Sequence, residues 1–137
     1  MRLLGNEELA RKWYLIVDHV DRSLVHGAGS LTSHSLFLEC MQGNGQCWLR
    51  EDEFGMILGV AITRFEMSVN HKVLAICVTT DNDWFAHGDD SHALLEQFAK
   101  HCNCQRMAVY GRKGWTKVLK QFGYYEPYSV MIKDLEV

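Results

Sequence analysis

Two apolar runs in the middle of the chain constrain its fold more than any other feature. One spans Met56 to Phe65, and the other, Val73 to Val78, consists entirely of apolar residues. Both have the length of a strand, and neither alternates in the way that leaves one face to solvent. A strand without a polar face must be covered on both sides, so we expect an α/β fold with helices on both faces of one sheet.

Helical periodicity flanks these runs on both sides. Apolar residues at steps of three and four predict a first helix from Asn6, with Asn6 as a cap, and Thr32 or Ser33 is expected to cap a second. Asp89 or Asp90 is expected to cap a third helix, and Gly123 to end a fourth. The predicted order is strand 1–4, helices from 6 and 33, strands 46–51, 56–65 and 72–79, helix 89–102, strand 106–110, helix 115–122 and strand 128–135.

The totals limit the class of protein. A chain of 137 residues with 47% hydrophobic and 23% charged residues fits one globular domain over residues 1–137. The net charge of -3 comes without a basic stripe, so we expect no nucleic-acid partner. The longest apolar run, Met56 to Ile62, is too short to span a bilayer, and the first residues lack a signal sequence, so no membrane partner is expected.

The cysteines and histidines suggest neither disulfides nor a metal site. Five cysteines are an odd number without regular spacing, which is typical of a reduced, cytoplasmic protein. The segment His101 to Cys104 holds soft ligands, but structural zinc needs a second pair, and the sequence has none. We therefore predict no metal site.

Several segments resemble the GNAT superfamily of N-acetyltransferases. Lys72 to Thr79 and the helix from Asp89 resemble the family's fourth strand and the helix after it. The stretch Arg106 to Tyr125, with Gly123 and Tyr124, resembles its last helix and the Gly-aromatic signature. The particular form of residues 110–124 is similar to small GNAT-like proteins of tailed bacteriophages, some of which are virion components. The resemblance implies a mixed, mostly antiparallel sheet of six to seven strands with four helices on both faces.

The resemblance also implies a site for acetyl-CoA, whose pyrophosphate rests on backbone amides at the start of the helix after the fourth strand. The family pattern there is Arg or Gln, two residues, Gly, one residue, then Gly or Ala. In this sequence Ala86 takes the first position, and Asp89 and Ser91 replace the two small residues. The cofactor positions implied for a degenerate loop are Val78, Thr79, Ala86, His87, Gly88, Asp89, Asp90 and Ser91.

The family's acid–base residues are also altered. Counted from Gly123, the tyrosine that protonates the departing thiolate in many members corresponds to Leu119, and an asparagine to Arg112. Tyr110 and Tyr128 are the phenols that remain near the expected cleft. A general base needs a carboxylate or imidazole near the amine, and the turn between the strands ending at 65 and starting at 72 supplies the remaining candidate catalytic residues, Glu66 and His71.

Two functions remain open. Trp84 and Phe85 follow three polar residues in an expected loop, and exposed aromatics are typical of a protein interface. The first hypothesis is therefore a catalytically degenerate GNAT-like protein that acts in a phage particle or on a host protein, in the host cytoplasm or the virion. The second is an active N-acetyltransferase that uses acetyl-CoA with an atypical pyrophosphate loop, since attack by a bound amine needs mainly positioning.

Overall fold

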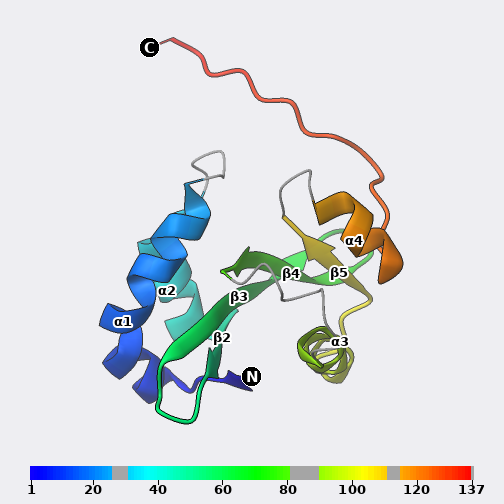
Figure 1. The fold of residues 1–137 in the computed structure, drawn as a ribbon. Coiled ribbons are helices and arrows are strands. Elements are labelled where there is room, and N and C mark those ends of the chain that lie inside the picture. The colour runs from blue at the N-terminus through cyan, green and yellow to red at the C-terminus, as the bar shows by residue number, and fades with distance from the viewer. Residues whose placement is uncertain (26–30, 81–89, 111–114, 137) are drawn as a thin grey trace.

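The computed structural model describes residues 1–25, 31–80, 90–110 and 115–136. Its helices and strands follow the predicted order up to the fourth helix (Figure 1). The elements are β1 (Arg2–Leu3), α1 (Asn6–Leu24), α2 (Ser33–Met41), β2 (Gly45–Glu51), β3 (Ile57–Met67), β4 (Lys72–Thr79), α3 (Ser91–His101), β5 (Arg106–Val109) and α4 (Thr116–Gln121).

The strands form one mixed sheet in the order β1-β2-β3-β4-β5. The first three pairs are antiparallel, and the last pair, β4 with β5, is parallel. A parallel neighbour needs a crossover connection, and α3 lies within it. The mixed α/β class and the antiparallel majority of pairs agree with the prediction, but the described residues form five strands instead of six to seven.

The predicted strand over residues 128–135 is wrong for the single chain. Residues 124–136 contain neither helix nor strand, and Val130 and Ile132 are 73% and 63% exposed. Alternation is a valid strand signal only where a neighbouring edge accepts the backbone hydrogen bonds, and none is bonded to this segment in the described structure. We call residues 124–136 the tail.

Helices cover the two faces of the sheet with separate apolar clusters. On one face, Leu9 and Ile16 of α1 and Leu36 of α2 pack against β2, β3 and β4. On the other face, Leu95 of α3 packs with Trp48, and side chains of α4 lie against the same cluster. The two pairs of helices therefore lie on opposite sides of the sheet, as the apolar strands require (Figure 1). Within the described ranges, no helix has the length and hydropathy of a membrane span.

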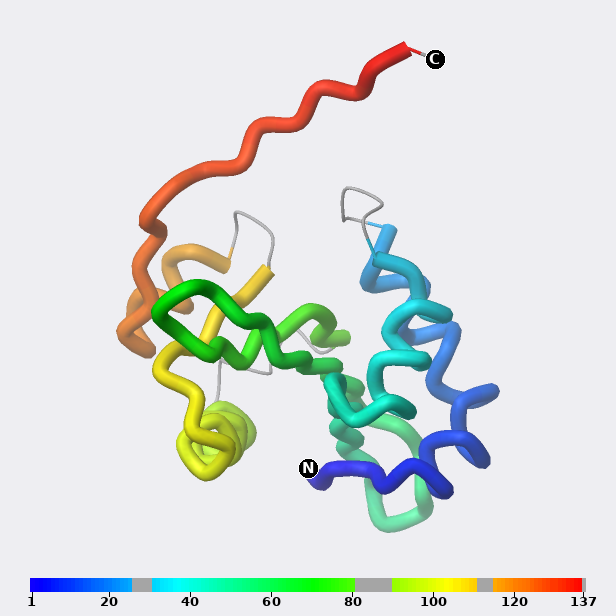
Figure 2. Tube along the Cα trace, turned by 180° about the vertical axis from the view of Figure 1, so that it is seen from behind, coloured from blue at the N-terminus to red at the C-terminus, as the bar shows by residue number. Residues whose placement is uncertain are grey.

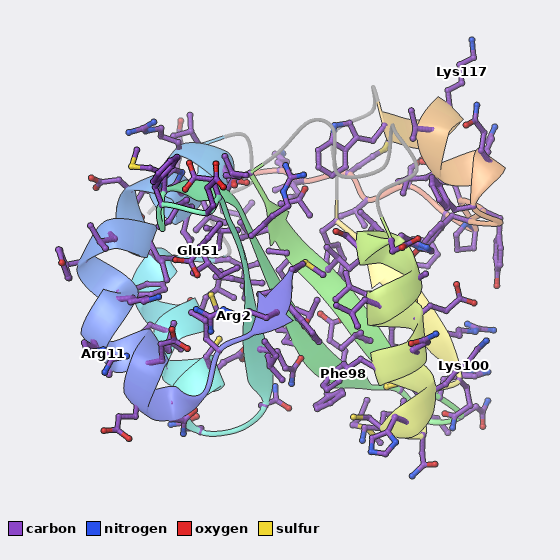
Figure 3. The ribbon with its side chains drawn as sticks, turned by 60° about the horizontal axis from the view of Figure 1, so that its bottom comes forward. Arg2, Arg11, Glu51, Phe98, Lys100 and Lys117 are labelled. Carbon is purple, nitrogen blue, oxygen red and sulfur yellow. The ribbon has the colours of Figure 1, made fainter. Side chains whose placement is uncertain are left out.

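Ion pairs bind the first strand to its neighbours. The guanidinium of Arg2 lies 2.6 Å from Glu8 of α1 and 2.8 Å from Glu51 of β2 (Figure 3). Lys12 joins the same two carboxylates, at 2.9 Å from Glu8 and 3.4 Å from Glu51. A network of this kind compensates for the small number of backbone bonds that a two-residue strand can make.

The helix starts differ from the predicted caps at two of three positions. Asn6 does not cap α1, because its side-chain amide donates to the carbonyl of Met41 instead, at 3.1 Å. Asp90 occupies the cap position of α3 but makes no capping hydrogen bond. Thr32 does cap α2 as predicted, since its hydroxyl accepts from the amide of Ser35 at 3.0 Å and the Ser35 hydroxyl accepts in return.

We expect Thr32→Ala to lower the free energy of unfolding by about 1 kcal/mol, because the amide of Ser35 loses its acceptor. Urea denaturation followed by circular dichroism measures this loss. Thr32→Ser retains a hydroxyl at the same position and serves as the control. Equal losses in the two variants would contradict the assigned role of the cap.

Candidate functional site

The two parallel strands, β4 and β5, separate about halfway along β4. β4 pairs with β5 from Val73 to Ile76, and the amide of Tyr110 adds one last bond to the carbonyl of Ile76 at 3.2 Å. β4 continues to Thr79, bonded there to β3 alone. In the described structure, the β5 side of residues 77–79 therefore carries backbone groups that no strand occupies, and a ligand can pair with them.

A β-bulge lies where the strands separate. Ile62 of β3 stands opposite Val78, whereas the next residue, Thr63, stands opposite Ile76. Cys77 is therefore an extra residue in β4, and a bulge of this kind bends the strand and redirects its backbone groups. Burial raises the pKa of the Cys77 thiol to about 12, so it remains protonated and is not a nucleophile at neutral pH.

Two buried hydroxyl groups lie at the ends of the segment that joins β4 to α3. Thr79 is 9% exposed and Ser91 is 3% exposed. Neither Thr79 Oγ1 nor Ser91 Oγ has a hydrogen-bond partner in the described part of the chain. Buried polar groups in proteins nearly always have a partner. Of these two predicted cofactor residues, Thr79 follows the separation of the strands by two residues, and Ser91 begins α3.

The start of α3 lacks an acidic side chain that caps it in the described structure. Asp90 is exposed and makes no side-chain bond to the helix, and the first turn contains no acidic residue. Among the described residues, no side chain therefore caps the first backbone amides of this 11-residue helix, whose positive dipole end favours negative charge. The predicted residues Ala86, His87, Gly88 and Asp89 of the loop, and the predicted interface residues Trp84 and Phe85, lie outside the described residues.

Glu66 and Tyr110, two of the four predicted catalytic residues, meet in one hydrogen bond. The Tyr110 hydroxyl donates to Glu66 Oε2 at 2.6 Å, and Arg64 donates to Glu66 Oε1 at 3.1 Å. Because β4 lies between β3 and β5, the Tyr110 ring crosses β4. Burial and the bond to Glu66 raise the pKa of Tyr110 to about 12. Each carboxylate oxygen of Glu66 therefore already accepts one hydrogen bond, and an amine that reaches Glu66 shares it with Arg64 and Tyr110.

The other two predicted catalytic residues lie apart from this pair. His71 is in the turn between β3 and β4, where its backbone amide donates to the Ser68 hydroxyl at 3.2 Å. Tyr128 is on the tail and 74% exposed. The sheet therefore joins Glu66 to Tyr110 and includes neither His71 nor Tyr128 in the same hydrogen-bonded group.

Leu119 occupies the place that the resemblance gives to a tyrosine. Gly123 has a φ of 88°, the left-handed conformation that ends a helix, so counting back from it along α4 is valid. Leu119 packs against the apolar cluster of the α3 and α4 face. This position therefore carries an aliphatic side chain in an apolar environment, with no hydroxyl group that could donate a proton.

A partly buried histidine–tyrosine pair was not predicted from the sequence. His92 Nε2 lies 2.8 Å from the Tyr124 hydroxyl, and the His92 ring is 4.7 Å from that of Phe122. Burial lowers the pKa of His92 and raises that of Tyr124. The pair joins the first turn of α3 to the chain after α4. The only signal in the sequence was a histidine on the inner face of its helix.

We expect His92 to make stability depend on pH. Its pKa in the folded chain lies below the ordinary value of 6.5, so the unfolded chain takes up the proton first. The stability that neutral His92 contributes is complete above pH 6.5. It is lost as the pH falls through the lower pKa that His92 has in the folded chain. The difference in unfolding free energy between wild type and His92→Gln should narrow from neutral pH toward pH 5, as urea titrations would measure; a constant difference would contradict it. His101→Gln, at an exposed position, is the control.

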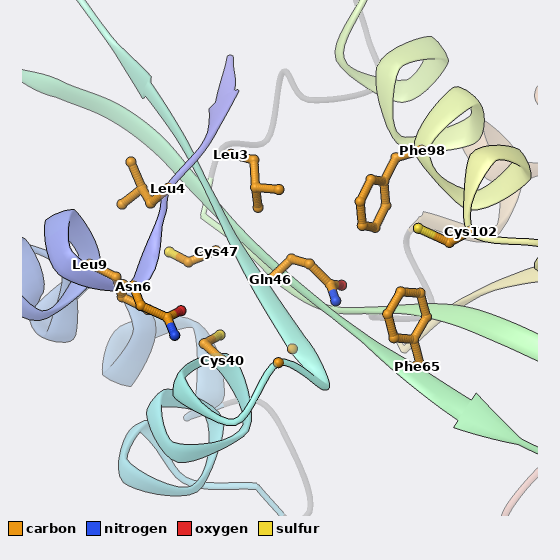
Figure 4. A pocket seen from close by; sticks show the side chains of 12 residues that line it. Leu3, Leu4, Asn6, Leu9, Cys40, Gln46, Cys47, Phe65, Phe98 and Cys102 are labelled. Carbon is orange, nitrogen blue, oxygen red and sulfur yellow. The ribbon is translucent and has the colours of Figure 1, made fainter.

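Two cavities lined by described residues lie elsewhere. One, of about 260 Å³, opens beside the start of β2. It lies between Cys40 and Leu9 on one side and Phe65 and Phe98 on the other (Figure 4). The other, of about 560 Å³, is a shallow groove between β1 and α3. In both, apolar lining outweighs the few polar groups, and no group of side chains among the described residues could hold a metal ion.

Comparisons with known proteins extend to nearly the whole chain. No protein-family model matches the sequence, and no curated protein matches it. A predicted acetyltransferase from Clostridium acetobutylicum, solved with acetyl-CoA, superposes with a TM-score of 0.69 at 13% identity, covering 97% of this chain and 94% of its own. An aminoglycoside acetyltransferase from an uncultured soil metagenomic sample, solved with sisomicin, has a TM-score of 0.67 at 14% identity, covering 98% and 95%.

An acetyltransferase from Trypanosoma brucei is similar as well, with a TM-score of 0.62 at 15% identity and coverage of 98% of this chain and 97% of its own. These solved structures are GNAT-family acetyltransferases, and the likeness extends over the full sheet and its helices. The chain therefore has the GNAT acetyltransferase-like fold.

Proposed function

We propose that this chain is a catalytically degenerate GNAT-fold protein that acts as a protein-interaction module. The observation that carries the proposal is Leu119, which is partly buried against an apolar cluster at the position where the resemblance implies a proton-donating tyrosine. Glu66 supports it, because both of its oxygens are engaged by Arg64 and Tyr110. An acyl transfer that lacks a free acid and a free base loses the factor of roughly 100 to 10,000 that general catalysis contributes.

The partner that we propose is a protein, either of a phage particle or of the host cell. The resemblance of residues 110–124 to phage-encoded GNAT-like proteins suggests this source. The proposed place of action is the host cytoplasm or the virion.

Calorimetry with acetyl-CoA tests the proposal. We expect no binding heat at millimolar acetyl-CoA and no release of free CoA when primary amines are added, read by chromatography so that the protein's five cysteines do not interfere. Sub-millimolar binding together with amine-dependent CoA release would overturn the proposal. Leu119→Tyr is the matched variant, because it restores the phenol that the family has at this position. CoA release by Leu119→Tyr without CoA release by the natural chain would support the proposal that the natural chain has lost activity at Leu119.

A second candidate, an active acetyl-CoA-dependent N-acyltransferase, is favoured by a different observation. The separation of β4 and β5 at the Cys77 bulge is suited to an extended ligand rich in amides and phosphates. The hydroxyls of Thr79 and Ser91, which have no hydrogen-bond partner among the described residues, support such a ligand. If acetyl-CoA binds, Asp90→Gly should tighten binding, because it removes a negative charge beside the start of α3. Ser91→Ala should weaken binding. Weaker binding in Asp90→Gly would contradict this placement of the phosphates.

A further inference from the structure

The tail combines exposure with the pattern of a buried strand. Its first residue is fixed to the body, since the Tyr124 hydroxyl lies 2.8 Å from His92 and 4.0 Å from the sulfur of Met107. Beyond it, large apolar side chains are open to solvent. The exposed fractions are 74% at Tyr128, 73% at Val130, 94% at Met131, 63% at Ile132 and 79% at Leu135. Proteins rarely expose a group of large apolar side chains to solvent unless these residues form a contact surface.

The body of the same chain carries an open sheet edge. β5 is hydrogen-bonded to β4 on one side, and the described structure shows no backbone bond on its other side. Met107 and Val109 of β5 point into the apolar cluster beneath α4. An unpaired edge with an apolar face is a template for one more strand.

The tail does not reach its own β5 with its apolar residues. From Tyr124, beside Met107, it advances to Tyr128, which is close enough to influence Tyr110, so it runs in the direction of β5. β5 ends at Val109, and residues 130–135 lie past that end, which Figures 1 and 2 both show as a segment leading away from the sheet. A reversal would need a tight turn, and residues 128–133 contain no Gly, Pro, Asn or Asp.

We propose that residues 128–135 of one copy add a strand to the free edge of β5 in a second copy, in a symmetric exchange. Each copy contributes one open edge, that of β5, and one unpaired strand segment. Two copies can therefore satisfy both edges and both segments in a two-fold symmetric dimer, which leaves no edge for a third copy. In the added strand, Val130 and Ile132 share a face, and that face continues the cluster of Met107 and Val109. This inference does not depend on whether the chain binds acetyl-CoA.

Sedimentation velocity of the full chain tests the exchange. We expect a concentration-dependent dimer. Successive residues of a strand direct their N–H groups to opposite sides, so one of the variants Met131→Pro and Ile132→Pro removes a bond to β5 and should raise the dissociation constant about ten-fold or more. Met131→Ala changes the side chain alone and should leave the dissociation constant nearly unchanged. Since Met131 and Ile132 are 94% and 63% exposed in the single chain, none of these variants should alter its fold, and near-ultraviolet circular dichroism checks that.

A second pair of variants separates the two faces of the tail. Ile132→Asp should dissociate the dimer by placing a charge in the apolar cluster, whereas Lys133→Asp, on the opposite face, should not. A wild-type chain that remains monomeric at its highest soluble concentration overturns the inference, as does a dimer that both Met131→Pro and Ile132→Pro leave intact. A tail that binds a different protein while the purified chain stays monomeric also overturns it.

Discussion

Leu95→Ala should lower the free energy of unfolding by about 2–5 kcal/mol, since truncation of a fully buried leucine removes its transfer free energy and leaves a cavity. Leu95 has no exposed surface and holds α3 against Trp48, Ala61 and Ile76 of the sheet. These three residues belong to three different strands, so they cannot collapse into the space without moving the sheet or α3.

Urea denaturation of Leu95→Ala followed by tryptophan fluorescence measures this loss. Leu94→Ala is the matched control, because Leu94 is the neighbouring residue of the same helix and only partly buried. We expect it to cost less than half as much. Equal losses at the two positions would mean that α3 is not packed as described.

Thr63→Val should cost about 2–4 kcal/mol, the second large effect. The Thr63 hydroxyl donates to Gln46 Oε1 at 2.7 Å and accepts from Trp48 Nε1 at 3.0 Å. All three residues are buried. Valine has nearly the same shape but leaves an indole donor and an amide oxygen without partners, and each buried unpaired group costs about 1–3 kcal/mol.

Thr63→Ser separates the hydroxyl from the methyl group in this experiment. It retains both hydrogen bonds and loses one methyl, so we expect a loss of about 1 kcal/mol. The measurement is again the urea midpoint at constant slope. If Thr63→Val proved as stable as Thr63→Ser, the three-residue network would contribute nothing to stability.

Most of the fold could be predicted because its signals are local. The runs at residues 56–65 and 73–78 lack a polar face, and the structure covers both sides of each with helices. The end of the last helix at Gly123 could be predicted because its positive φ favours glycine. The tail failed as a strand for a non-local reason: its pattern is that of a strand, but pairing depends on an edge elsewhere in space.

The candidate site was harder to predict. Glu66 and Tyr110 were both chosen, but their hydrogen bond depends on β4 lying between their strands, a matter of topology that one sequence does not state. The bulge at Cys77 has no signal in the sequence, since its run is uniformly apolar. The pairing of His92 with Tyr124 joins residues 32 positions apart, and neither residue type alone indicates it.

The parallel pairing of β4 with β5 has a consequence for the order in which the chain folds. β2, β3 and β4 follow one another directly and pair through short connections, whereas Val109 must be brought to Ile76 across all of α3. Contacts between distant residues lose more chain entropy before they gain energy, so they form late. We expect the amides of β2 to β4 to gain protection before those of β5 in pulsed hydrogen exchange, and simultaneous protection would contradict this order. During synthesis on the ribosome, β2, β3 and β4 would then pair before β5 has been made. Until β5 is made, the edge of β4 that pairs with it would remain without a neighbouring strand.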